Sequence, residues 1–144
     1  MERRRVLFIC VGNSARSIMG EAILRQLASD RYEVHSAGLS PTAVRPETLT
    51  VLQEAGFDTQ GLQSKCVDEY LGRVFCHFVI TVCEEAAEGC PRVWPPGGVP
   101  LSWPVPDPAL ESGDEEQRMQ AFRRARDDLR ARIEGWLEVQ ANDS

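Results

Sequence analysis

The sequence contains no long hydrophobic run, since none of its apolar segments approaches the ~20 residues that a membrane-spanning helix needs. It also contains no patch of positive charge. Its 16 basic and 22 acidic residues leave a net charge of -6, and the arginines after Asp114 alternate with acids. A phosphate backbone would find no basic surface on such a chain. These absences argue against binding to membranes and to nucleic acids.

Several common site motifs are missing as well. No Gly-Lys-Ser/Thr phosphate loop and no GxGxxG occurs, so the chain has neither of these nucleotide-binding signatures. No CxxC pair or cysteine and histidine cluster has the spacing of a zinc site. The only two histidines, His35 and His77, lie in strand-like segments, where we expect ordinary structural roles. We therefore expect no metal and no cofactor.

The amino terminus resembles a secretory signal only in part. "MERRR" is basic, but the apolar run "VLFICV" covers six residues, fewer than the ~7 to 15 of a signal peptide. Without an export signal, the five cysteines are expected to be reduced thiols, some of them catalytic or redox-active, instead of a disulfide framework. These features favour a cytoplasmic protein.

What the sequence does contain is an alternation of strand-like and helix-like segments. The predicted elements are strands over 5–11, 32–37, 74–82 and 101–103, helices over 17–29, 46–55 and 114–140, and a helical turn near 67–71. Such alternation is typical of right-handed βαβ units and of a parallel sheet covered on both faces. At 144 residues we expect a single α/β domain over residues 1–144.

The stretch "CVGNSARS" joins the first predicted strand to the first predicted helix. In a parallel sheet, ligands bind beyond the carboxyl ends of the strands. Gly12, Ser14 and Ala15 are small enough to let the loop curl tightly, so that its N–H groups form a nest for a tetrahedral oxyanion. Arg16 adds a planar fork that can hold two oxygens. The stretch therefore predicts an oxyanion site.

Cys10 lies beneath this loop and would face the central atom of the bound anion. The N–H dipoles and the guanidinium that hold the anion should also stabilise a thiolate, which is the nucleophilic form. Ser17 can donate a hydrogen bond to that sulfur, and we expect it also to cap the following helix. The alternative is that Cys10 is a small buried hydrophobe and Arg16 a surface charge.

The segment "VLFICVGNSARS", together with the chain after it, resembles the low-molecular-weight protein tyrosine phosphatase superfamily. Over nearly its whole length, the sequence is most similar to the thioredoxin-coupled arsenate reductases built on that fold. The resemblance implies a flavodoxin-like three-layer domain with a four-stranded parallel sheet. It implies Cys10 as nucleophile, Asp107 as general acid, and Asn13 and Ser36 as supports of the loop. The residues expected around the oxyanion are Val11, Gly12, Asn13, Ser14, Ala15, Arg16 and Ser17.

Asp107, in "PDPA", also has a chemical rationale of its own. Breaking a bond to an oxygen leaving group needs a proton donor opposite the nucleophile, and a loop aspartate can be brought there. The alternative is that Asp107 is only a turn former or a cap before Pro108.

Two activities share the attack of Cys10 on a bound oxyanion: a phosphatase then adds water, and a reductase adds a second thiol. Cys83 ends the central predicted strand and Cys90 lies further on in "CEEAAEGCP", a pair that resembles the resolving cysteines of the reductases. A purely structural pair is the alternative. Ala109 stands where related tyrosine phosphatases usually carry an aromatic residue, which favours a small inorganic anion.

We therefore expect reduction of arsenate to arsenite, with phosphate as a competitor. Cys10 attacks arsenic, Cys83 attacks the Cys10 sulfur, Cys90 displaces Cys10, and an external dithiol such as thioredoxin reduces the final disulfide. The alternative is a phosphatase acting on phosphotyrosine or another phosphomonoester through Cys10 and Asp107. A non-catalytic anion-binding or redox-sensing module is disfavoured by Asp107. We expect a monomer.

Members of the reductase family can bind potassium beside the loop. Asn13, Glu21 and Ser36 match three of the positions that hold the ion, and Glu21 thereby also supports the loop. The fourth position falls near "QSKC", where Lys65, the chain's only lysine, replaces an acid. We expect its ammonium to take the place of the ion.

Overall fold

The computed structural model describes residues 3–70, 72–84 and 98–142. Its four strands form one parallel sheet in the order β2-β1-β3-β4. The strands are β1 (Arg4–Cys10), β2 (Tyr32–Gly38), β3 (Phe78–Thr81) and β4 (Val99–Ser102), and the helices are α1 (Arg16–Ala28), α2 (Pro46–Glu54), α4 (Glu115–Asn142) and the 3-10 turns η1 (Val67–Glu69) and η2 (Pro108–Leu110). The predicted flavodoxin-like α/β class with a four-stranded parallel sheet is confirmed.

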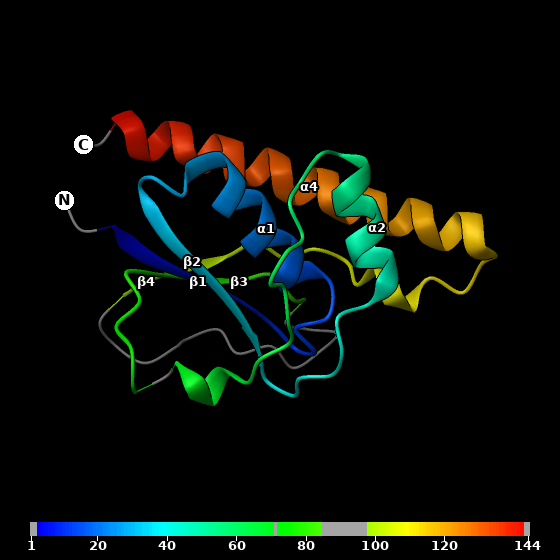
Figure 1. The fold of residues 1–144 in the computed structure, drawn as a ribbon, viewed down its shortest axis with the longest axis horizontal. Helices are drawn as coiled ribbons and strands as arrows, with labels where there is room; N and C mark the ends of the chain where they lie inside the picture. Colours follow the sequence, from blue (N-terminus) through cyan, green and yellow to red (C-terminus); the bar gives the residue numbers. More distant parts are fainter. Residues whose placement is uncertain (1–2, 71, 85–97, 143–144) are drawn as a thin grey trace.

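Strand β1 is buried on both faces. Val6 and Phe8 pack into a large core with side chains of α1 and α4, whereas Leu7 and Ile9 point to the other face and pack against residues around η1. Because successive strand side chains point to opposite sides, the nearly continuous apolar run of β1 supplies both cores. Figure 1 shows α1 and α4 stacked on one side of the sheet and η1 on the other.

Helix α1 lies directly on β1. A Cβ at Gly20 would sit 2.7 Å from the Phe8 ring, so only glycine allows this close approach. Ile18, Met19 and Ile23 are fully buried around it. This packing holds the first turn of α1, with Arg16, beside the end of β1 at Cys10.

The carboxyl-terminal helix α4 covers the same face of the sheet as α1. Phe122, Leu129, Ile133 and Trp136 are buried in the core, and the Trp136 ring stacks edge-on against Phe78 with centroids 5.1 Å apart. None of the helices in the described part of the chain combines the length and apolar character that a membrane crossing requires.

The boundaries of the central strand were predicted wrongly. The apolar run from residue 74 to 82 pairs with β1 only over Phe78–Thr81. Before it, the Val74 N–H donates to the Tyr70 carbonyl in a turn, and Val74 and Phe75 are exposed. The edge strand β4 begins at Val99, two residues earlier than predicted. Cys90 lies outside the described residues, as do all residues from 85 to 97.

Candidate active site

The candidate site lies beyond the carboxyl ends of β1 and β3. Cys10 is the last residue of β1 and is buried, with 2% of its surface exposed. Residues 11–15 curl from there to the start of α1 at Arg16. The loop, Arg16 and Asp107 line one cavity of about 520 Å³. The structure thus places the predicted nucleophile, the anion clamp and the candidate proton donor around a common space.

The carbonyl groups of the loop are fixed by a neighbouring segment. The chain between β2 and α2 runs along the loop and donates to its oxygens through the N–H groups of Leu39, Ser40, Thr42 and Arg45, which bond the carbonyls of Cys10, Val11, Gly12 and Ser14. A trans peptide points its N–H and C=O in opposite directions, and the described chain contains no cis bond. The N–H groups of these peptides therefore point away from the segment between β2 and α2.

Asn13 locks the sharpest part of the loop. Its φ of 48° is in the left-handed region, which asparagine tolerates better than most residues. Consecutive backbone N–H groups converge where right-handed and left-handed conformations alternate along the chain. The buried side chain donates to the hydroxyls of Ser17, at 2.7 Å, and Ser36, at 3.0 Å. Its Oδ1 accepts from the Lys65 N–H at 2.7 Å. Asn13 thus links the loop to α1, to β2 and to the backbone at Lys65.

Ser17 contacts the sulfur of Cys10, with Sγ and Oγ 2.9 Å apart. Because the Ser17 oxygen already accepts from Asn13, its own hydrogen is available for the sulfur, and such a bond stabilises a thiolate. The expectation that Ser17 caps α1 was wrong. The N-cap is Ala15, without a side-chain hydrogen bond, because the hydroxyl of Ser17 faces Cys10 instead of the helix end.

The guanidinium of Arg16 connects the loop to the opposite wall of the cavity. Arg16 is only 3% exposed. Its Nη1 donates to the Val105 carbonyl at 3.0 Å, and Nη2 lies 3.7 Å from Asp107 Oδ2. These contacts hold Asp107 at the cavity that Cys10 also lines.

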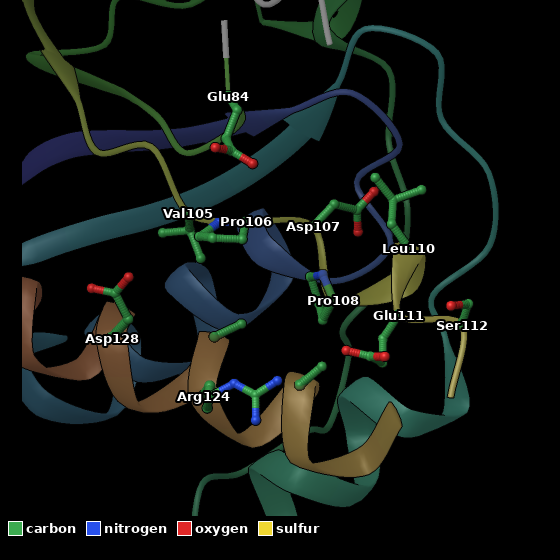
Figure 2. Close-up of a pocket in the computed structure, with 12 residues that line it drawn as sticks. Glu84, Val105, Pro106, Asp107, Pro108, Leu110, Glu111, Ser112, Arg124 and Asp128 are labelled. Atoms are coloured by element: carbon green, nitrogen blue, oxygen red, sulfur yellow. The ribbon is translucent and has the colours of Figure 1, made fainter. Parts of the chain in front are cut away.

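Asp107 lies at the cavity and also caps a turn. Its Oδ1 accepts from the Ala109 N–H at 3.0 Å and so caps η2, while Oδ2 faces Arg16. Asp107 and Leu110 also line a second cavity of about 600 Å³ beside α4, shown in Figure 2 with Arg124 and Asp128 on the helix. A carboxyl between two openings is accessible to solvent protons, as a general acid must be.

Behind the loop, Ser36 and Glu21 continue the network that begins at Asn13. The Ser36 hydroxyl donates to Glu21 Oε1, and Lys65 Nζ lies 3.7 Å from the same oxygen. The other carboxylate oxygen pairs with Arg25. Glu21 is 2% exposed, and a buried carboxylate needs such cationic partners. The lysine ammonium therefore lies next to the buried carboxylate of Glu21.

The other cysteines differ in their surroundings. Cys83 is buried and lies just after β3, at the same edge of the sheet as Cys10; it is disulfide-bonded, whereas Cys10, Cys66 and Cys76 are free. Burial raises the pKa of the Cys76 thiol, so this side chain stays protonated and is a poor nucleophile. Cys90 lies outside the described residues.

Sequence reasoning missed the second wall of the cavity. Ser40, Thr42 and Arg45 line it together with the loop. The available signal was topological: the segment after the second predicted strand must leave the sheet at the same edge as Cys10, so the polar residues of "SPTAVR" belonged among the candidates.

Gly38→Ala tests the support of the loop. A Cβ at this position would lie 2.7 Å from the Val11 carbonyl and 2.9 Å from the Asn13 nitrogen, so the loop must shift. Because even a small shift of the loop misplaces the groups that hold the oxyanion, we expect phosphate affinity to fall about 10- to 100-fold. Isothermal calorimetry with phosphate measures the effect.

Gly135→Ala is the matched control, since a Cβ there meets nothing within 4 Å. It should leave phosphate binding unchanged. Equal phosphate affinity in the Gly38 and Gly135 variants would show that the loop tolerates the displacement.

A low molecular weight phosphotyrosine protein phosphatase family model matches residues 5–143. With the thiol, loop and arginine arranged as above, the chain belongs to this family of enzymes.

The chain is 33% identical over 140 residues to an arsenate reductase of Bacillus subtilis (strain 168), a match that covers 96% of this chain and 99% of the relative. Among solved structures, an arsenate reductase in the phosphate binding state matches with a TM-score of 0.76 and 27% identity, covering 94% of this chain and 97% of that one. A thioredoxin-dependent arsenate reductase of Corynebacterium glutamicum matches with a TM-score of 0.70 and 30% identity, covering 97% and 63%.

Proposed function

We propose that this protein reduces arsenate to arsenite with the Cys10 thiolate as nucleophile. The observation that carries the proposal is the cavity itself, which is lined by Cys10, the buried Arg16 and Asp107 together with a loop whose carbonyls are bonded to the neighbouring segment. The similarity to arsenate reductases over nearly the whole chain favours arsenate over other oxyanions. Phosphate, of the same shape and charge, should compete.

In the first step, the Cys10 thiolate attacks As(V) while Asp107 donates a proton to the departing oxygen, which leaves as water. Arg16 and the loop N–H groups hold the remaining oxygens and the charge that develops on them. Ser17 stabilises the thiolate beforehand, through the 2.9 Å contact. The product is a covalent Cys10–arsenic adduct.

In the second step, Cys83 attacks the Cys10 sulfur. The electron pair of the sulfur–arsenic bond passes to arsenic, which leaves as arsenite in the As(III) state, and a Cys10–Cys83 disulfide remains. Cys90 then attacks Cys83 and releases the Cys10 thiol. An external dithiol, which we propose is thioredoxin, reduces the Cys83–Cys90 disulfide. The cycle uses two electrons and regenerates all three thiols, so it requires a reducing compartment such as the cytoplasm.

Hydrolysis of a phosphomonoester is the second candidate, because it uses the same nucleophile and acid. It would require water to reach the Cys10 adduct before Cys83 does. The presence of Ala109, with its small side chain, at the cavity removes the aromatic contact expected for a phosphotyrosine ring and favours the reductase.

A direct assay separates the two activities. Arsenate-dependent NADPH oxidation is measured with thioredoxin and its reductase, beside hydrolysis of a chromogenic aryl phosphate at the same enzyme concentration. We expect the first rate to exceed the second by at least tenfold. Aryl phosphate turnover without arsenate-dependent oxidation would establish the phosphatase instead.

We expect little dependence on potassium, because Lys65 already places a cation 3.7 Å from Glu21 Oε1. Exchanging sodium for potassium at constant ionic strength should change kcat/KM less than about twofold. Lys65→Ala removes one of the cationic partners of the Glu21 carboxylate. In this variant, replacing sodium with potassium should therefore raise kcat/KM several-fold. A several-fold rise in the unmodified protein would refute the role of Lys65.

A further inference from the structure

The cavity at Cys10 is larger than the anion at its base requires. Its volume is about 520 Å³, whereas a tetrahedral oxyanion occupies only a few times the ~30 Å³ of a water molecule. An ion held by Arg16 and the loop N–H groups therefore fills the inner part of the cavity. The outer part is left for a further group, and its lining determines which chemistry fits there.

Arg45 is a second arginine, beside Arg16, among the residues that line this cavity. Its backbone is fixed, since its N–H donates to the Ser14 carbonyl at 3.1 Å and its carbonyl accepts from Thr48 and Leu49 at the start of α2. The residue is exposed. Among the described residues, its guanidinium makes no hydrogen bond and no ion pair. Arg45 thus has a fixed backbone beside the loop, and its guanidinium has no partner among the described residues.

The neighbouring groups also suit an anion. Ser40 and Thr42, from the same segment, line the cavity and carry hydroxyls that can donate hydrogen bonds. The only carboxylate among the described residues that line the cavity is Asp107, and it faces Arg16 at 3.7 Å. Among the described lining residues, no carboxylate is therefore left to neutralise Arg45. A guanidinium matches the geometry of carboxylate and phosphoryl oxygens.

We propose that Arg45, with Ser40 and Thr42, forms an outer anion subsite, and that the pocket takes molecules carrying a second anionic group next to a tetrahedral oxyanion. The ligand class is small phosphoryl or phosphonyl compounds with a carboxylate or a second phosphoryl group. The inner group binds at the Cys10 loop and the outer group at Arg45. This proposal rests on the oxyanion site of the proposed function and not on the reduction of arsenate.

The test compares two probes on the reduced protein. Methylphosphonate carries the inner group alone, and phosphonoacetate adds a carboxylate. Calorimetry gives their dissociation constants, and protection of Cys10 from iodoacetamide shows that each binds at the thiol. We expect phosphonoacetate to bind about tenfold more tightly than methylphosphonate.

Variants assign this preference to Arg45. In Arg45→Ala the two probes should bind about equally, with the affinity for methylphosphonate changed less than twofold, and Arg45→Lys should retain part of the preference. Arg124→Ala removes an exposed arginine of α4 that does not line this cavity and should keep the full preference.

Equal binding of the two probes to the unmodified protein would overturn the outer subsite, as would a preference that survives Arg45→Ala. An equal weakening of both probes in Arg45→Ala would also overturn it, because it would place Arg45 at the inner anion. If neither probe protects Cys10, the inner oxyanion site is wrong and the proposed function fails with it. Binding of methylphosphonate without the preference leaves the proposed function intact.

Discussion

Cys10→Ser should lower arsenate reduction by about a thousandfold or more. A serine hydroxyl in this position is not ionised and cannot form the disulfide that releases arsenite, so both the attack and the resolution steps are lost. The substitution is nearly isosteric, and the loop that binds the anion is held by contacts that do not involve the sulfur. Phosphate should therefore bind with little change, as calorimetry would show, while the thioredoxin-coupled assay shows no turnover.

Two other thiols provide controls for this variant. Cys66 and Cys76 are free and have no place in the proposed cascade, so Cys66→Ser and Cys76→Ser should keep arsenate turnover within about twofold. Substantial arsenate reduction by Cys10→Ser would exclude Cys10 as the nucleophile and with it the whole mechanism.

Arg16→Ala should lower kcat/KM for arsenate about 100- to 1000-fold. The variant loses the fork that holds two oxygens of the anion in the transition state. It also removes the partner of Asp107 and of the Val105 carbonyl, so the proton donor is no longer held at the cavity. Steady-state kinetics should show both a higher KM and a lower kcat, because anion binding and acid positioning are affected together.

Arg16→Lys separates charge from geometry. It restores a cation without the planar fork, so we expect it to recover part of the affinity but little of kcat. Arg124→Ala, on α4, should behave like the unmodified protein. A loss smaller than tenfold in Arg16→Ala would show that the loop N–H groups suffice for binding and catalysis.

The central part of the fold was predictable from local patterns. The continuous apolar run of β1 indicates a strand buried on both faces, and the small residues after Cys10 indicate a tight loop that leads into a helix. The structure agrees closely with this pattern. Helix α4 was equally clear, because its apolar positions recur at helical spacing and its arginines alternate with acids.

Two features of the structure could not be predicted from the sequence pattern. Val74 and Phe75 continue the apolar run of the third strand, but a turn closed on Tyr70 takes them out of the sheet. Ser17 has the identity of a helix cap, yet its hydroxyl is drawn to the sulfur of Cys10. In the first case one local preference yields to another, because Tyr70 is only four residues before Val74. In the second, a local preference yields to a contact with Cys10 on another element.

The wall of the cavity that includes Arg45 was missed for a related reason. Its residues lie far from Cys10 in the sequence and carry no motif of their own. They reach the site because the strands β1 and β2 pair in register up to Cys10 and Gly38, so the next segment runs along the loop. Lys65 was placed near the site by resemblance, whereas its distance to Glu21 depends on the bridge between Gly38 and Cys66.

The most direct test of the proposed cascade is a single turnover without external reductant. Fully reduced protein is mixed with arsenate, quenched by thiol alkylation, and studied by peptide mass mapping together with speciation of arsenic. The proposed cascade predicts one arsenite for each protein molecule, a disulfide between Cys83 and Cys90, and an alkylated Cys10. Release of arsenite with Cys83 and Cys90 still alkylated, or no arsenite at all from protein that binds phosphate, would contradict it.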